Sequence, residues 1–144
     1  MKTIAAYAVL VLLTIAQAHA QQTLGEVIDK GGQKLSKDEL AGLLPGTKHT
    51  SQLGAQGTRA WAHNVDGKLS ATSLGGSANT RGGPLRGEGT WNVIDPGKYC
   101  FNIEWPRSTE KRCMFVYKLG DAYFGVGDDA DKSISQMLRF TLEK

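Results

Sequence analysis

Short runs of alternating apolar and polar residues, separated by turn sequences, make up most of the chain after Thr47 and restrict its fold more than any other feature. Apolar side chains two positions apart face the same side of a strand, and Gly, Pro and Asp between the runs favour tight turns. The runs predict about seven or eight short strands. A sheet of that size closes into a small antiparallel barrel or folds into a two-layer sandwich, so we expect a mainly β domain.

Asp66-Gly67 is the clearest turn sequence between two of these runs. Asp-Gly favours a two-residue type I′ loop, because glycine accepts the positive φ that this turn requires. Such a loop would pair His63 with Ser70 and Trp61 with Thr72 on neighbouring strands.

Two further turns predict hairpins in the second half of the chain. Gly120-Asp121 would join two runs so that Tyr117 lies opposite Phe124 in an aromatic and apolar ladder. Asp95-Pro96-Gly97 would reverse the chain between the runs on either side of it. Residues 134–142 fit either a last strand or a helix, because their apolar positions match both periods.

One or two short helices are predicted before the first strand, because two Ser/Thr-x-x-Glu capping boxes occur there. Thr23 with Glu26 would begin the first helix, and Ser36 with Glu39 would begin the second. Apolar residues then recur at helical spacing, and Gly-Gly or Pro-Gly ends each segment. We expect these helices to cap the sheet rather than to bind a ligand.

The two cysteines, Cys100 and Cys113, lie on consecutive predicted strands that meet at Pro106-Arg107. With a two-residue loop at this tip they face each other in a non-hydrogen-bonded pair, where side chains approach most closely. We therefore expect a structural disulfide that contributes about 2 to 3 kcal/mol. The alternative is a redox or metal pair, but twelve residues separate the cysteines, unlike the Cys-x-x-Cys of oxidoreductases.

The same register also creates unfavourable neighbours, with Phe101 opposite Arg112 and Ile103 opposite Glu110. A longer or bulged tip would relieve this, although a shift of one residue would move the two sulfurs to different faces. The turn type is therefore left open, whereas the cysteine pairing is retained.

Residues 1–20 have the pattern of a secretory signal peptide. Lys2 gives a positive start, Ile4 to Ile15 form an apolar run, and Ala18-His19-Ala20 is a small-x-small cleavage site. The alternative is a membrane anchor, but the apolar run is shorter than the ~20 residues that cross a bilayer. We therefore expect export and cleavage, and an oxidising compartment in which the cysteines can bond.

After cleavage, residues 21–144 would form a single β-rich domain with residues 36–126 as its core. The chain carries 17 basic and 14 acidic residues, and its net charge of +3 falls to about +2 without Lys2. The densest basic group, within residues 107–112, is interrupted by Glu110, so we expect no nucleic-acid partner. We expect a periplasmic or secreted protein with no membrane span after cleavage.

Trp61, Trp91, Trp105 and Tyr117 are the candidate ligand-binding residues, because aromatic side chains line the cavities of small barrels. The alternative is that these residues fill the core. The Gly-rich segment 75–87 predicts a long mobile loop, which an inhibitor or envelope-stress protein would insert into the cleft of an enzyme.

Asp128, Asp129 and Asp131 are the candidate metal ligands, because a hard cation such as calcium binds several carboxylates around a turn. Their spacing differs from that of an EF-hand, and a capped turn is the alternative. A serine hydrolase would need a nucleophile at a tight turn, but Gly75-Gly76-Ser77-Ala78 lacks the Gly-x-Ser-x-Gly pattern. A lone His63 is more often a packed side chain than a general base. We expect no cofactor and no enzyme activity.

A series of short motifs occurs in an order that is similar to a known family. The motifs are Glu39-Leu40, Leu43-Leu44-Pro45-Gly46-Thr47, Asp66-Gly67, Gly89-Thr90-Trp91-Asn92-Val93, Tyr99-Cys100, Trp105, Cys113, Val116-Tyr117, Gly120 and Tyr123. From Ser36 to Val126 the chain resembles the domain-of-unknown-function family numbered 995, which consists of small exported proteobacterial proteins. The resemblance implies a periplasmic or secreted bacterial domain, with no established activity and no catalytic residues. Segments 75–87 and 127–129 have no counterpart in it.

The sequence therefore favours an exported, noncatalytic module that binds an unknown small ligand or an envelope protein, or that has a structural role. An inhibitor that acts through segment 75–87 is the alternative, and a hydrolase ranks last.

Overall fold

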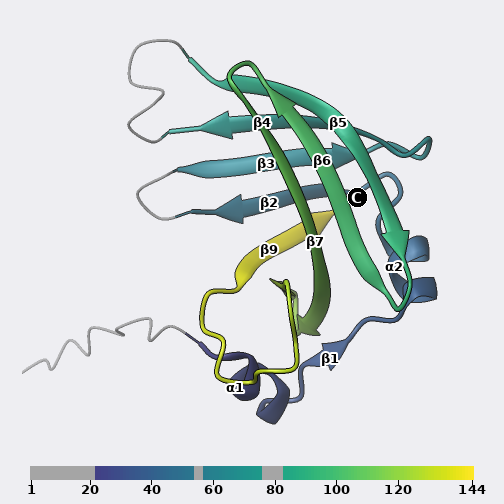
Figure 1. Ribbon diagram of the computed structural model, residues 1–144, viewed down its shortest axis with the longest axis vertical. Helices are drawn as coiled ribbons and strands as arrows, with labels where there is room; N and C mark the ends of the chain where they lie inside the picture. The colour runs from purple at the N-terminus through teal and green to yellow at the C-terminus, as the bar shows by residue number, and fades with distance from the viewer. Residues whose placement is uncertain (1–21, 54–56, 76–82) are drawn as a thin grey trace, which may run out of the picture.

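The computed structural model describes residues 22–53, 57–75 and 83–144. The predicted signal peptide and most of the predicted Gly-rich loop lie outside the described residues. The described part of the chain forms two helices and nine strands (Figure 1). In chain order they are α1 (Leu24–Asp29), β1 (Gln33–Lys34), α2 (Lys37–Leu43), β2 (Lys48–Gln52), β3 (Thr58–His63), β4 (Lys68–Leu74), β5 (Leu85–Ile94), β6 (Lys98–Trp105), β7 (Ser108–Leu119), β8 (Ala122–Val126) and β9 (Leu138–Glu143).

Strands β2 to β9 form a closed antiparallel barrel. Their order around the sheet is β7-β6-β5-β4-β3-β2-β9-β8, and β8 pairs back with β7. The short strand β1 pairs with β7 as an extra strand. The predicted fold class is confirmed, with a barrel rather than a sandwich and with two short helices. The C-terminal segment is a strand rather than a helix, and it closes the barrel between β2 and β8.

The β3–β4 hairpin corrects the predicted register. His63 lies opposite Leu69, one residue away from the predicted partner Ser70. The predicted pair of Trp61 with Thr72 is wrong by the same step. A one-residue shift of this kind changes which face each partner side chain occupies.

The cause of this shift is a loop one residue longer than predicted. The carbonyl of Asn64 accepts the N–H of Gly67 at 3.1 Å, and the Asp66 carboxylate accepts the N–H of Lys68 at 3.0 Å. Within this loop only Gly67 adopts a positive φ, of 81°, whereas a type I′ turn requires two such residues. The longer loop places buried side chains opposite buried side chains.

The other predicted hairpins are confirmed. Tyr117 lies opposite Phe124 across β7 and β8, and Asp95-Pro96-Gly97 joins β5 to β6. Cys100 and Cys113 face each other across β6 and β7.

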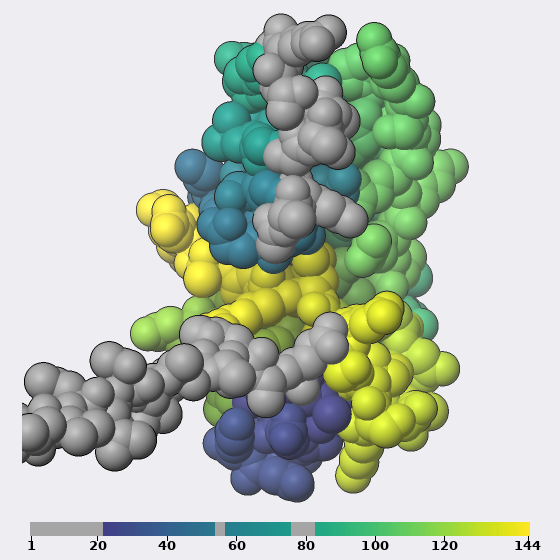
Figure 2. Space-filling model, turned by 90° about the vertical axis from the view of Figure 1, so that its left-hand side faces the viewer, coloured from purple at the N-terminus to yellow at the C-terminus, as the bar shows by residue number. Residues whose placement is uncertain are grey.

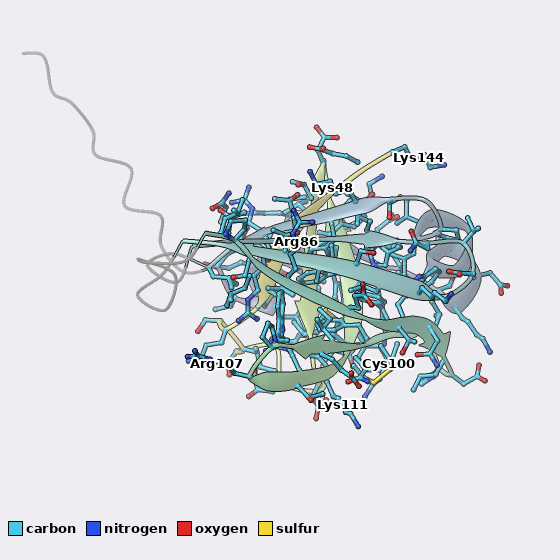
Figure 3. The ribbon with its side chains drawn as sticks, turned by 90° about the horizontal axis from the view of Figure 1, so that it is seen from above. Lys48, Arg86, Cys100, Arg107, Lys111 and Lys144 are labelled. Atoms are coloured by element: carbon cyan, nitrogen blue, oxygen red, sulfur yellow. A yellow bond between two sulfur atoms is a disulfide. The ribbon has the colours of Figure 1, made fainter. Side chains whose placement is uncertain are left out.

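The Sγ atoms of these two cysteines are bonded at 2.05 Å, and their Cα atoms are 4.0 Å apart, as expected for a close, non-hydrogen-bonded pair. Trp105 pairs with Ser108, so the tip is the two-residue loop without a bulge. Figure 3 shows the disulfide at the outer side of the sheet.

Both predicted capping boxes are present. The Thr23 hydroxyl accepts the N–H of Glu26 while the Glu26 carboxylate accepts the N–H of Thr23, and Ser36 and Glu39 bond in the same way. Helix α2 covers one end of the barrel and packs Leu40 into the core, while α1 packs outside the barrel. No helix among the described residues is long and apolar enough to cross a membrane.

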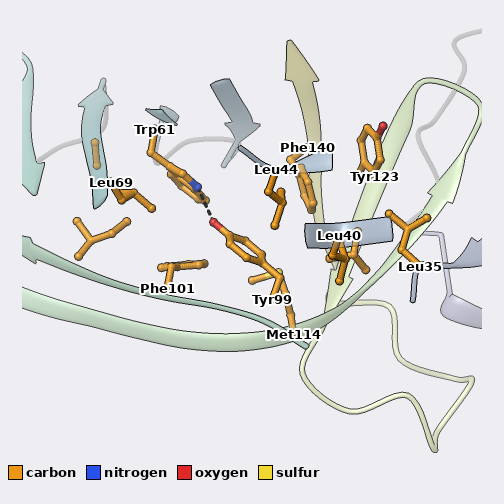
Figure 4. Close-up of a cluster of buried hydrophobic side chains, with 13 residues drawn as sticks. Leu35, Leu40, Leu44, Trp61, Leu69, Tyr99, Phe101, Met114, Tyr123 and Phe140 are labelled. Carbon is orange, nitrogen blue, oxygen red and sulfur yellow. Dashed lines mark hydrogen bonds between the residues drawn. The ribbon is translucent and has the colours of Figure 1, made fainter. Parts of the chain in front are cut away.

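Strand β7 separates two hydrophobic cores. Met114 and Val116 point into the barrel, whereas Phe115 and Tyr117 point outward and pack under α1, because successive side chains of a strand alternate between its faces. The barrel core is filled with large side chains (Figure 4). Its buried members are Leu35, Leu40, Leu44, Trp61, Leu69, Ala71, Tyr99, Phe101, Ile103, Met114, Val116, Tyr123 and Phe140.

Strand β5 begins inside the segment predicted as a loop. Residues 85–87 pair with β4, so the predicted end of segment 75–87 is wrong. A Cβ atom on Gly87 would lie 2.8 Å from the side chain of Ile103 and 2.9 Å from that of Trp105. This glycine therefore makes room for large neighbours and does not form a turn.

Candidate functional site

A small cavity opens on the side of the barrel and is bordered by strands β2, β3, β7 and β9. It has a volume of about 90 Å³, and we call it the side pocket. Its lining residues are Ser51, Leu53, Arg59, Trp61, Glu110, Arg112 and Leu138. Figure 2 shows the face of the molecule on which β9 (yellow) and the blue strands meet the green strands. Most of the lining residues are on strands, so the sheet holds them in place.

An ion pair crosses the barrel interior at the side pocket. Arg59 Nη1 on β3 lies 2.6 Å from Glu110 Oε2 on β7. Trp105 Nε1 donates to the same oxygen at 3.3 Å, and its ring lies 5.5 Å from the Arg59 guanidinium. These contacts explain how Glu110 can lie opposite Ile103, because an arginine from a distant strand compensates its charge.

The side pocket retains unused hydrogen-bond donors on its two arginines, and Glu110 Oε1 is an unused acceptor beside them. Arg112 Nη2 lies 3.8 Å from Glu110 Oε1, too far for a hydrogen bond, and the Arg112 side chain is 52% exposed. The buried Nε of Arg59 has no hydrogen-bond partner within the described residues. Ser51 already donates its hydroxyl to the carbonyl of Arg139 at 3.0 Å.

The lining contains two arginines and one glutamate and is therefore positively charged. A negatively charged acceptor would complement it.

An aromatic stack lies beneath the side pocket. The Trp61 ring, which lines the pocket, stacks on His49 with centroids 3.8 Å apart, and His49 stacks on Phe140 at 4.1 Å. His49 is fully buried, and neither of its ring nitrogens has a hydrogen-bond partner in the described part of the chain. Burial, together with the nearby His63, lowers the pKa of His49 to about 2, so the ring is neutral.

A directional chain of hydrogen bonds continues from Trp61 toward α2. Trp61 Nε1 donates to Tyr99 Oη at 2.9 Å, and Tyr99 lies 2.8 Å from His63 Nε2. Because the indole nitrogen can only donate, we assign the Tyr99 proton to the bond with His63. His63 Nδ1 then donates to Thr47 Oγ1 at 3.2 Å, and Thr47 donates to the Leu44 carbonyl at 2.7 Å.

Burial keeps this chain of hydrogen bonds uncharged. It lowers the pKa of His63 to about 4 and raises the pKa of Tyr99. Because both histidines lie inside the barrel, neither reaches the solvent as a general base would need to.

Two of the four aromatic residues predicted to bind a ligand lie at the side pocket. Trp61 lines it, and Trp105 bonds to Glu110. Trp91 lies near the β3–β4 turn, where its Nε1 donates to the carbonyl of Asn64 at 3.0 Å. Tyr117 faces the outer core under α1. The four rings are therefore not gathered around one cavity.

Arg59 and Arg112 were missed as site residues by the sequence analysis. Arg59 is 51 positions from its ion-pair partner Glu110, so only the closure of the barrel brings the two together. The available signal was the unfavourable position of Glu110 opposite Ile103. A charge on the inner face of a strand needs a counter-ion from elsewhere in the fold.

The three candidate metal ligands have separate partners. Asp129 Oδ2 accepts bonds from Lys34 Nζ at 2.6 Å and from Tyr117 Oη at 2.8 Å. Asp128 accepts the N–H of Ala130, and Asp131 accepts the N–H and the hydroxyl of Ser133, as in capped turns. Among the described residues, no group of three or more His, Cys, Asp or Glu is arranged to hold a metal ion.

Burial and the bond to Asp129 raise the pKa of Tyr117 to about 12. Burial alone would raise the pKa of Asp129, but the bonds from Lys34 and Tyr117 outweigh it and lower the pKa of this carboxyl. This group is therefore a structural contact that connects β1 and β7 to the segment after β8.

A wider hollow of about 490 Å³ lies near α2, β1 and the β7–β8 turn. Its charged residues include Glu39 and Lys118. Glu39 already caps α2, and Lys118 Nζ lies 5.8 Å from the centroid of the Tyr123 ring. The side pocket is the better candidate, because its polar groups retain unused donors.

Comparison of the chain with protein-family models and with curated proteins finds no match. The resemblance to the family numbered 995 therefore stays a prediction.

Proposed function

We propose that the protein is exported to an oxidising compartment, the periplasm or the exterior of a bacterial cell, and acts there as a noncatalytic binding module. Its binding place is the side pocket, and its ligand presents a carboxylate or a similar oxyanion. The observation that carries the proposal is the pair of arginines with unused donors, Arg59 and Arg112, at a cavity in the barrel wall.

Size supports a small acidic group. A water molecule occupies about 30 Å³ in the liquid, so a cavity of about 90 Å³ has room for a group of about three non-hydrogen atoms. A carboxylate has three such atoms, and arginine binds it through charge-assisted hydrogen bonds. The rest of the ligand would lie outside, because the barrel interior is filled by its own core.

The first test is a titration of the purified chain with acetate, succinate and phosphate, followed by NMR. Carboxylate addition should shift the indole N–H resonances of Trp61 and Trp105, because these groups lie at the pocket. Arg112→Gln should weaken carboxylate binding by about tenfold or more, since it removes a charged donor. Arg107→Gln, at the exposed tip of the same hairpin, is the matched control and should keep the affinity of the unchanged protein. Absence of any saturable shift with all three anions would refute the binding place.

Export has its own test. Intact-mass analysis of the chain recovered from the cell that makes it should give residues 21–144 with the mass of one disulfide bond. A retained Met1, or two free thiols, would overturn this part of the proposal.

A further inference from the structure

Strand β7 is longer than the strand that pairs with its outer edge. β8 pairs only with residues 115–119 of β7, whereas β6 pairs with residues 108–114 on the other edge. In the described part of the chain, residues 108–114 therefore have a strand neighbour on one side only. An unpaired strand edge presents free N–H and C=O groups to which another extended chain can add.

The hairpin register determines which groups these are. In a two-residue hairpin the residues that flank the loop form a hydrogen-bonded pair, and bonded and non-bonded pairs then alternate. Trp105 with Ser108 is the flanking pair, and the short Cα separation of the cysteines agrees with this phase. The backbone groups of Thr109, Lys111 and Cys113 therefore point toward the unpaired edge.

The unpaired edge borders the side pocket. Glu110 and Arg112 alternate with these three residues along β7, and their side chains line the pocket. Leu138, at the start of β9, lines the opposite side. A chain laid along the edge would follow the line of β8, and every second side chain would point inward toward the pocket.

The charges around the edge favour an acidic chain. Lys111 lies on the edge, and Arg112 lies in the pocket beside it. Glu110 is the acidic residue of the pocket, and its carboxylate is already bound by Arg59 and Trp105. The unused donors of the pocket are cationic, and the one carboxylate oxygen without a hydrogen bond, Glu110 Oε1, lies 3.8 Å from Arg112 Nη2.

We propose that an extended acidic segment of a partner protein adds to the barrel as a strand beside residues 108–114 of β7 and places one Asp or Glu carboxylate in the side pocket. This inference rests on the proposed function and specifies its ligand. Backbone bonds along the edge give affinity, and the pocket selects the acidic side chain, as in other strand-addition complexes.

The test uses a capped peptide, Thr-Val-Thr-Glu-Thr-Val-Thr, and the purified chain, with affinity measured by calorimetry. Two N-methylated versions carry their methyl groups on alternate residues, so that each blocks the backbone donors of one peptide edge. One version should bind within about twofold of the parent peptide, and the other should bind at least about tenfold more weakly. A Glu→Gln peptide should also lose about tenfold in affinity.

A change in the protein gives a second measurement. Lys111→Pro removes one N–H from the unpaired edge and should lower the affinity for the peptide by about fivefold, while the affinity for acetate stays the same. Lys111→Gln is the matched control, since it removes the charge but keeps the N–H. Near-UV circular dichroism checks that each variant retains the fold. If the proline variant does not fold, the N-methylated peptides decide the question.

The outcomes separate the two proposals. If acetate or succinate binds but neither methylation pattern matters, strand addition is wrong and the binding place stands. If neither the small acids nor the peptide binds, both proposals fail.

Discussion

Two histidines inside the barrel differ in their hydrogen bonding although their ring centroids lie only 6.3 Å apart. His63 is bonded through both nitrogens, to Tyr99 and to Thr47. His49 is held by stacking between Trp61 and Phe140 and has no polar partner within the described residues. A buried polar group without a hydrogen bond destabilises the folded state by about 1 to 3 kcal/mol.

Replacing His49 with phenylalanine should therefore stabilise the protein. The new ring keeps both stacking contacts and has no nitrogen to desolvate, although it is slightly larger. We expect His49→Phe to raise the free energy of unfolding by about 1 kcal/mol in a urea titration at pH 7.

His63→Phe is the matched comparison and should have the opposite sign. It leaves the Tyr99 hydroxyl without its acceptor, so we expect the free energy of unfolding to fall by about 1 to 3 kcal/mol. Equal losses for the two variants would contradict this account of His49.

At the scale of the element, β5 depends on glycine to lie close to β6. A Cβ atom on Gly89 would overlap the carbonyl oxygen of Asn102 on β6, which is backbone and cannot move alone. Gly42, inside α2, has no such neighbour within 4 Å of the position that a Cβ atom would take, so a methyl group there would meet open space.

These two glycines give opposite predictions for alanine. Gly89→Ala should lower the free energy of unfolding by at least about 2 kcal/mol, because the strands must separate. Gly42→Ala should raise it by about 0.5 to 1 kcal/mol, because alanine favours a helix. Urea titrations of both variants check this contrast, and a well-tolerated Gly89→Ala would show that the β5–β6 spacing is not as close as described.

Local elements could be predicted from the sequence where a few neighbouring residues determine them. The two capping boxes and the opposed cysteines are such cases, because each depends on residues within one helix or one hairpin. The register at Asp66-Gly67 was predicted wrongly, because the carboxylate of Asp66 and one positive φ at Gly67 stabilise a longer loop than the dipeptide alone indicates.

At the scale of the whole molecule, the choice between a closed barrel and a sandwich could not be predicted. It depends on β9 pairing with both β2 and β8, and no local pattern specifies these partners. The site follows from closure, since the Arg59–Glu110 ion pair joins strands far apart in the sequence. Sequence patterns therefore predicted that the chain is a β barrel or sandwich, but they did not predict its polar side pocket.

Acid should destabilise the whole fold through its buried histidines. Histidine has a pKa near 6.5 when unfolded, and the folded pKa is about 4 for His63 and about 2 for His49. Below about pH 6.5 the unfolded chain therefore binds more protons than the folded chain. The stabilisation that comes from the neutral histidines is fully present above that pH and is lost as the pH falls toward their folded-state pKa values. We expect a loss of roughly 2 to 4 kcal/mol between pH 7 and pH 5, measured by urea titration.

His49→Phe is the control for this pH dependence and should remove about half of the loss. The pKa values of Asp129 and Asp131 are lowered in the folded state, so their stabilisation disappears only below about pH 4. A change in the free energy of unfolding between pH 7 and pH 5 therefore comes from the histidines. An unchanged free energy of unfolding across that interval would contradict the assigned burial of both rings.

The alternation along β7 makes this strand intolerant of changes in length. A single residue inserted between Cys113 and Met114 would turn the side chains of Met114 and Val116 outward toward α1. It would also turn those of Phe115 and Tyr117 into the barrel. Such an insertion disturbs both cores together, whereas most substitutions affect one of them. In related proteins, additions and deletions should therefore be found at the turns that flank β7 and not within it.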